Sequence, residues 1–593
     1  LLAGGETMFL YNVVAAALLA LAWLACGRSS GVDRSVVRSP ATASFGPAML
    51  RLVAIGGIVG AVGFGLAAIK LLPGLELMPV TNRAGGLALA DAAAPIIEFT
   101  EPAMLSALTF GSRALHDKTH LFAGTCVLAL VGLIAGWCRR ETRWLAVAGA
   151  LLVIAGVAIA HSQTVFGMLW SALPMFKYQR IAQRALVLAF LGVSVLVALG
   201  ARRVLQTRWM RSTLARYLVG LLLVGIVSAE SLVAVPTLPP TADIRREIRA
   251  NQLLNHVAAG SGLFRIHAWE STDRNWGIEH VTVPLGLSNL AGWDHLWLRD
   301  YLGAESTVGR DVLPFLPASY MARHRERFWG IMNVRFVSAM QPLDRPGLKL
   351  ICRFPPCREC QPAKSAGPYL YENTQWLPRA WIVPRCVLVS GDPAERFLAT
   401  YQLLEDARFD PHRLVITCDE QHELAQHRSH DALIVPASDF EIAPGLAEQR
   451  SKLRARDQWL LSYSMQTPGL WHQPDELAEM LEDLMSRDPD PEPPVVETYR
   501  PGFIRLRLAG QVGFLVLAEK FAHFPGWDVR TAAGPRFLLR ANGVASAITL
   551  DGTEEWVELR YWPTGFARGL WITLASLVLV PLIGWFGDRL LRI

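Results

Sequence analysis

Seven apolar stretches constrain this chain more than any motif, because each is close to the roughly 20 residues that cross a ~30 Å hydrocarbon core. A backbone in lipid must satisfy its own hydrogen bonds, so each stretch is expected to be an α-helix. The alternative, buried helices of a large soluble protein, is disfavoured because several stretches carry no charge and the mean hydropathy is +0.28. The stretches are Met8–Cys26, Leu52–Ile69, Leu121–Trp137, Trp144–Ala160, Ala185–Gly200, Tyr217–Val235 and Phe566–Phe586.

Arginines indicate which loops face the cytoplasm. An excess of Lys and Arg in short loops marks the cytoplasmic side of a membrane protein. The loops after the first, third and fifth stretches are rich in arginine and poor in acids. The long polar segment 236–565 is therefore predicted to lie outside the cytoplasm. The inner loops also explain the net charge of +6, so nucleic acid is not needed as a partner.

The polar segment is predicted to hold two folded parts. Short apolar runs such as Ala380–Val383 indicate strands of a mixed α/β domain. After the proline-rich linker Asp488–Pro494 the pattern alternates with a period of two, and Asn542-Gly543 is typical of a hairpin turn. This second part is predicted to be a β-sandwich.

The predicted fold is a polytopic α-helical membrane protein with about seven transmembrane helices, an extracytoplasmic mixed α/β domain and a C-terminal β-sandwich before the last helix. Its predicted parts are a membrane domain with six helices at 1–235, the mixed α/β domain at 236–494, the sandwich at 495–562, and the last helix with a cytoplasmic tail at 563–593.

Five of the eight cysteines fall in the predicted outer domain. The spacing Cys352-x4-Cys357-x2-Cys360 supplies half of a zinc site, but no second pair stands nearby at a matching spacing. An oxidising compartment favours disulfides, and free thiols are the third alternative. The sequence does not fix the pairing of Cys352, Cys357, Cys360, Cys386 and Cys418.

Several segments, spread in order along nearly the whole chain, form one recognisable pattern. They are Leu72–Leu77 with Thr81-Asn82-Arg83, Leu173-Pro174 with Arg180 and Arg184, Tyr371–Asn373 with Leu377–Ala380, Phe524–Trp527, Ala541–Gly543 and Tyr561–Phe566. Together they resemble YfhO-like membrane proteins of the GT-C superfamily of polyprenyl-phosphate-sugar glycosyltransferases. Thr81 and Ala182 depart from the family pattern, where serine and proline are usual.

The resemblance implies a membrane glycosyltransferase of the bacterial plasma (inner) membrane, with its large domain outside. Its donor would be a polyprenyl-phosphate sugar, and its acceptor a cell-envelope glycan or polymer. The family's catalytic acid usually lies in the first outer loop, which would precede Leu1. The chain begins with Leu1, its first methionine is Met8, and the predicted topology places this end outside the cytoplasm without a basic signal region. We therefore expect this chain to be the downstream part of a longer protein, with at least one span missing.

The resemblance and the chemistry together nominate site residues. Cations must bind the donor phosphate and stabilise it as it leaves, and the guanidinium group of arginine suits this role. Arg83, Arg180 and Arg184 are the candidates, and Glu76 is the candidate general base. Arginines near a span end also serve as headgroup anchors, and a surface acid is often only solvated. No ligand cluster decides whether a divalent cation is needed, and no metal ligands are predicted.

Two other functions remain open at this stage. The chain is alternatively a non-catalytic, membrane-anchored scaffold or accessory protein whose outer domain binds glycan. A transporter is disfavoured, because the spans hold almost no charged residues and show no broken helices.

Overall fold

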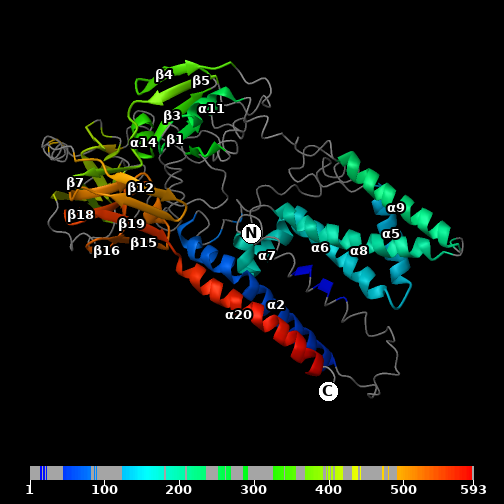
Figure 1. The fold of residues 1–593 in the computed structure, drawn as a ribbon. Coiled ribbons are helices and arrows are strands. Elements are labelled where there is room, and N and C mark those ends of the chain that lie inside the picture. The colour runs from blue at the N-terminus through cyan, green and yellow to red at the C-terminus, as the bar shows by residue number, and fades with distance from the viewer. Residues whose placement is uncertain are drawn as a thin grey trace. The chain divides into compact units, whose positions relative to one another are not determined.

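A computed structural model describes most of residues 45–81, 123–234, 251–268, 285–290, 325–355, 368–417 and 431–442, all of 491–590, and a few short stretches elsewhere (Figure 1). By its contacts the chain forms two compact units. The first comprises residues 1–71, 85–241 and 569–593, and the second comprises residues 72–84 and 242–568. The divisions near 71 and 569 fall within two long helices, α2 and α20.

Helices coincide with the second to seventh predicted spans, while the first predicted span lies largely outside the described residues. Three segments of the described chain, Ala61–Val80, Arg143–His161 and Leu186–Leu205, are long and apolar enough to cross a membrane. The chain is therefore a membrane protein, although the predicted count of seven spans is not confirmed. The matching helices are α2 (Phe45–Leu77), α5 (Ala123–Trp137), α6 (Arg143–His161), α8 (Leu186–Leu205), α9 (Thr213–Ala234) and α20 (Thr564–Leu590).

Glycines bring α5, α6 and α8 into backbone contact within the first unit. A Cβ atom on Gly132 of α5 would lie 1.8 Å from the carbonyl oxygen of Leu196 on α8. A Cβ atom on Gly192 of α8 would lie 2.5 Å from the carbonyl oxygen of Gly149 on α6. Helices in lipid associate through such close packing of small residues, since lipid provides no hydrophobic force between them.

Helices α2 and α20 lie side by side although they are far apart in sequence (Figure 1). The Thr573 hydroxyl of α20 donates to the carbonyl oxygen of Gly65 at 2.9 Å and accepts from the N–H of Ile69 at 3.1 Å. A Cβ atom on Gly569 would lie 2.3 Å from the carbonyl oxygen of Ala68. Small residues and a hydroxyl group therefore join the two helices.

The second unit is built on a seven-stranded mixed sheet with the order β6-β14-β18-β17-β8-β7-β9. Strand β7 pairs in parallel with β8 and β9, whereas β14 pairs antiparallel with β6 and β18. The strands are β6 (Ala380–Val383), β7 (Arg385–Ser390), β8 (Leu414–Thr417), β9 (Asp431–Pro436), β14 (Val512–Leu517), β17 (Leu539–Ala541) and β18 (Ala545–Asp551).

Two five-stranded sheets and a short two-stranded sheet complete the described strands of this unit. One has the order β2-β1-β3-β5-β4, with β1 (Arg265–Ala268), β2 (Ser288–Asn289), β3 (Val334–Ala339), β4 (Leu348–Arg353) and β5 (Tyr369–Asn373). The other has the order β12-β13-β19-β15-β16, with β12 (Val495–Arg500), β13 (Phe503–Arg507), β15 (Trp527–Thr531), β16 (Gly534–Arg536) and β19 (Trp556–Tyr561). The pair is β10 (Glu441–Ile442) with β11 (Trp471–His472).

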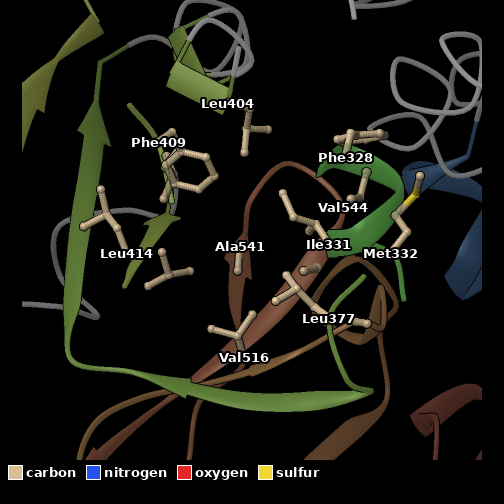
Figure 2. Packing of buried hydrophobic residues seen from close by; sticks show 14 of the residues in the cluster. Phe328, Ile331, Met332, Leu377, Leu404, Phe409, Leu414, Val516, Ala541 and Val544 are labelled. Carbon is tan, nitrogen blue, oxygen red and sulfur yellow. The ribbon is translucent and has the colours of Figure 1, made fainter. Parts of the chain in front are cut away.

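The seven-stranded sheet is buried on both faces. Successive residues of a strand point to opposite faces, and those of β14 divide accordingly between two cores. Phe514 and Val516 belong to the core that includes helix α14 (Arg325–Ile331), part of which is drawn in Figure 2. Leu515 and Leu517 belong to the core shared with β13 and β19.

A self-contained sandwich over 495–562 is not confirmed. Strand β6 lies before the predicted boundary at 494, yet it pairs with β14 and contributes Ala380 and Ile382 to the same core. The proline-rich linker therefore does not separate two independent sheets. Strands from both predicted parts form one sheet.

Candidate functional site

Glu76 lies in the last turn of α2, and its carboxylate reaches the start of α20. Its Oε2 accepts a hydrogen bond of 2.5 Å from the backbone N–H of Gly565. The first N–H groups of a helix lack partners within the helix, and an acid at this end also favours the helix dipole. Gly565 leaves room for this approach, because a Cβ atom there would lie 2.7 Å from Oε2. Glu76 therefore caps α20.

The environment of Glu76 is partly apolar and includes Tyr561, the last residue of β19. Burial and the nearby Glu76 carboxylate both raise the pKa of the Tyr561 phenol, so the phenol stays neutral at physiological pH. Glu76 is half-buried, and among the described residues its Oε1 atom accepts no hydrogen bond.

Arg184 lies in the short 3-10 helix η4 (Ala182–Ala185), directly before α8. It is half-buried, while its neighbours Ala182 and Ala185 are fully buried. A Cβ atom on Gly156 of α6 would lie 2.9 Å from the carbonyl oxygen of Ala185, so tight packing fixes the backbone beside Arg184.

The other two predicted cations, Arg83 and Arg180, lie outside the described residues. Sequence spacing predicts that Arg180 and Arg184 share one helix face. The 3-10 geometry at Arg184, with about three residues per turn instead of 3.6, changes the spacing that this prediction assumed. A shared face therefore stays a prediction.

Lys177 is a cation that the sequence analysis missed. It lies in the 3-10 helix η3 (Pro174–Tyr178), half-buried, with its ammonium nitrogen 5.0 Å from the ring centre of Trp170. Gly86 packs against it, since a Cβ atom on Gly86 would lie 2.7 Å from the Cβ of Lys177. In sequence Gly86 follows Arg83 by three positions, and Lys177 precedes Arg184 by seven. This contact therefore joins Gly86 to Lys177 within the first unit.

A charged cluster centred on Glu519 lies inside the second unit. The Glu519 carboxylate pairs with Arg265 at 2.9 Å and with Arg379 at 3.1 Å, and it accepts a hydrogen bond from the Tyr499 hydroxyl. Arg379, from the family-like Pro378-Arg379-Ala380 segment, is only 4% exposed. Its guanidinium lies 5.3 Å from the ring centre of Tyr499. The residues of this cluster connect three sheets, which indicates a structural role for the Pro378-Arg379-Ala380 segment.

The described cysteines of the second unit are free thiols. Cys352 is partly exposed, and Cys386 is buried beside the Thr417 hydroxyl at 3.2 Å. Burial raises the pKa of the Cys386 thiol to about 12, so it stays protonated and unreactive. Cys357, Cys360 and Cys418 lie outside the described residues. Among the residues that the structure does describe, no group of three or more His, Cys, Asp and Glu side chains is placed to hold a metal ion.

Comparisons with known proteins found a weak structural similarity between this chain and two solved structures. No family model matches the chain, and no curated protein matches it. Two solved structures of the arabinofuranosyltransferase AftD from mycobacteria are similar over 93% of this chain. One, of a mutant, has 13% identity and a TM-score of 0.29, and the other has 14% identity and a TM-score of 0.31.

This chain covers 46% and 44% of those two chains, which is less than half of their length. At these TM-scores the likeness by itself assigns neither a fold nor an activity to this chain.

Proposed function

We propose that this chain acts in a membrane glycosyltransferase that moves a sugar from a polyprenyl-phosphate donor to a cell-envelope glycan or polymer. The reaction would take place at the outer face of a bacterial plasma membrane, with the second unit outside the cytoplasm. The ordered segments that resemble YfhO-like proteins support this proposal, as do the apolar helices of the first unit. The observation that carries it is that Lys177 and Arg184 lie on two successive short 3-10 helices, the second of which runs directly into the apolar helix α8.

The proposed donor explains why cationic side chains are expected near the ends of membrane helices. A lipid-linked phosphate is held at the bilayer surface, so groups that bind it must lie near the ends of membrane helices. Arg83, Arg180 and Arg184 would bind the phosphate through charge-assisted hydrogen bonds, and Lys177, seven positions before Arg184 in the sequence, would add a compact charge. The acceptor hydroxyl attacks the anomeric carbon, the bond from that carbon to the phosphate oxygen breaks, and the polyprenyl phosphate leaves.

Replacing Arg180 and Arg184 together by Ala is expected to weaken donor binding about 100-fold or more. Two lost hydrogen bonds to a charged group together account for at least about 3 kcal/mol, and each 1.4 kcal/mol is tenfold in affinity. Binding would be measured with labelled polyprenyl-phosphate sugar and purified protein in nanodiscs.

The matched control removes two charges from the other end of the same helix. Arg202 and Arg203 are exposed residues in the last turn of α8, and Ala at both positions should leave donor binding unchanged. Equal donor affinity in the Arg180→Ala/Arg184→Ala variant and the unmodified protein would contradict the assignment.

Glu76 is the candidate general base within this proposal, acting through Oε1 while Oε2 caps α20. A glutamine side chain can still accept the Gly565 hydrogen bond but cannot take a proton at neutral pH. Glu76→Gln is therefore expected to keep the melting temperature and to lower transfer by about 100-fold. Glu76→Ala is expected to lose the cap as well, at a cost of about 0.5–2 kcal/mol in the free energy of unfolding. If Glu76→Gln transfers sugar at the normal rate, Glu76 has no role beyond the cap.

A further inference from the structure

The turn between β12 and β13 presents two exposed arginines around one aromatic ring. Arg500 and Phe503 are opposite each other across the turn, and Phe503 is opposite Arg560 of β19. The guanidinium carbons of Arg500 and Arg560 lie 4.9 and 5.5 Å from the centre of the Phe503 ring. The half-buried ring therefore keeps both charges at one end of the sheet.

A hydrogen bond joins this turn to the last residue of β19, three residues before α20. The N–H of Tyr561 donates to the carbonyl oxygen of Gly502 in the turn at 2.9 Å. The N–H of Trp562 donates to the carbonyl oxygen of Gly526 at 2.7 Å, and its ring meets that of Phe566 at 5.1 Å in an edge-on contact. Tyr561 is 38% exposed and Trp562 is 60% exposed. Along the chain, two exposed aromatic residues thus separate Arg560 from α20.

Helix α20 is longer than the hydrocarbon core is thick. The helix has 27 residues, which at 1.5 Å per residue is about 40 Å, whereas the hydrocarbon core is about 30 Å thick. The apolar stretch within it begins at Phe566, so Tyr561 and Trp562 precede the hydrocarbon if α20 crosses the membrane. Trp and Tyr are enriched at that boundary because their rings are apolar while one end is polar.

Charges on the sheet face that carries Phe503 favour an anionic partner. Arg560 pairs with Glu558 at 2.9 Å, but Glu558 also pairs with Arg505 at 2.8 Å. Among the described residues Arg500 has no ion-pair partner. On the same sheet Arg507 pairs with Glu497 at 3.7 Å and Arg530 pairs with Asp528 at 2.8 Å, so these two charges are compensated by neighbouring acids.

We propose that Arg500, Phe503, Arg560, Tyr561 and Trp562, here named the hairpin patch, bind the headgroup layer of the membrane that α20 enters. The two guanidinium groups contact the phosphates of anionic lipids, and the aromatic rings lie at the boundary of the hydrocarbon. Basic residues near an anionic membrane surface are attracted to it, and salt screens the attraction. The inference rests on the membrane crossing of α20 and not on sugar transfer, so the two proposals fail separately.

Hydrogen exchange of the full chain in nanodiscs tests this inference without a donor. Backbone exchange in the β12–β13 turn is compared in phosphatidylcholine alone and in phosphatidylcholine with phosphatidylglycerol. We expect phosphatidylglycerol to slow exchange of the turn about tenfold, and high salt to remove that difference. Arg500→Ala/Arg560→Ala should abolish the difference between the two lipid mixtures.

The control variant Arg507→Ala/Arg530→Ala removes the same charge from the same sheet, where these side chains are 63% and 61% exposed. It should keep the response to phosphatidylglycerol. Equal exchange of the unmodified turn in both lipid mixtures would overturn the inference. A slowing that needs only one polyprenyl phosphate per protein, with no response to phosphatidylglycerol, would also overturn it in favour of a donor site.

Discussion

Replacing Glu519 by Ala is expected to lower the free energy of unfolding of the second unit by about 3–5 kcal/mol, because two largely buried arginines lose the carboxylate that balances their charge. Arg379 is 4% exposed and Arg265 is 16% exposed, and both lose their carboxylate. Among the described residues the Nε of Arg379 already has no hydrogen-bond partner. Burial lowers the pKa of its guanidinium, so burial destabilises the charged form. Tyr499 would lose its acceptor as well.

Thermal unfolding of the purified full chain in detergent measures this effect. A loss of this size should lower the melting temperature of the unit by at least about 5 °C. Glu497→Ala is the matched control, since that carboxylate is 37% exposed and pairs with Arg505 at 3.2 Å on the surface. Surface pairs contribute about 0–1 kcal/mol, so this control should change little. Equal melting temperatures for the two variants would show that the Glu519 cluster is not a stabilising centre.

Replacing Gly132 by Leu is expected to disrupt the packing of α5 on α8, with a loss of about 3 kcal/mol or more. Overpacking usually costs about 1–3 kcal/mol, when side chains can shift to make room. Here the atoms in the way are backbone, since a Cβ atom on Gly132 would lie 1.8 Å from the carbonyl oxygen of Leu196 and 2.7 Å from the backbone nitrogen of Gly200. The two helices must separate to admit any side chain.

Gly220 of α9 is the control, because a Cβ atom there would meet nothing within 4 Å. Gly220→Leu should leave the protein monodisperse in detergent and unchanged in melting temperature. Gly132→Leu should lower the melting temperature and the yield of monodisperse protein. A Gly132→Leu protein as stable as the Gly220→Leu protein would contradict the close packing of α5 and α8.

The helices could be predicted from the sequence because a run of apolar residues is a local signal. The position at which α2 ends could not be predicted in the same way. Leu72–Leu77 lies just outside the predicted span Leu52–Ile69, and proline usually ends or bends a helix. In the structure α2 continues through Pro73 to Leu77. Its last turn is held by the Glu76 contact with Gly565, a residue 489 positions away, and no local pattern encodes that contact.

The pairing of strands in the sheets also could not be predicted from local sequence patterns. Strand β6 looks like a strand from its composition, but its pairing with β14 joins residues on opposite sides of a proline-rich linker. Register and pairing depend on which apolar faces meet in three dimensions, which a sequence pattern alone does not give. At the candidate site, the resemblance nominated Arg184 and Glu76. Lys177 was missed, because its nearness to the segment after Arg83 depends on the tertiary contact with Gly86.

Transfer of labelled sugar from a polyprenyl-phosphate donor tests the central claim most directly. The intact gene product would be reconstituted in liposomes with a preparation of envelope glycan, and label in the glycan would be measured. We predict transfer by the unmodified protein, and at least a 100-fold loss in the Arg180→Ala/Arg184→Ala variant with its melting temperature unchanged. Binding of the glycan without any transfer would contradict the claim and would identify the protein as a glycan-binding scaffold.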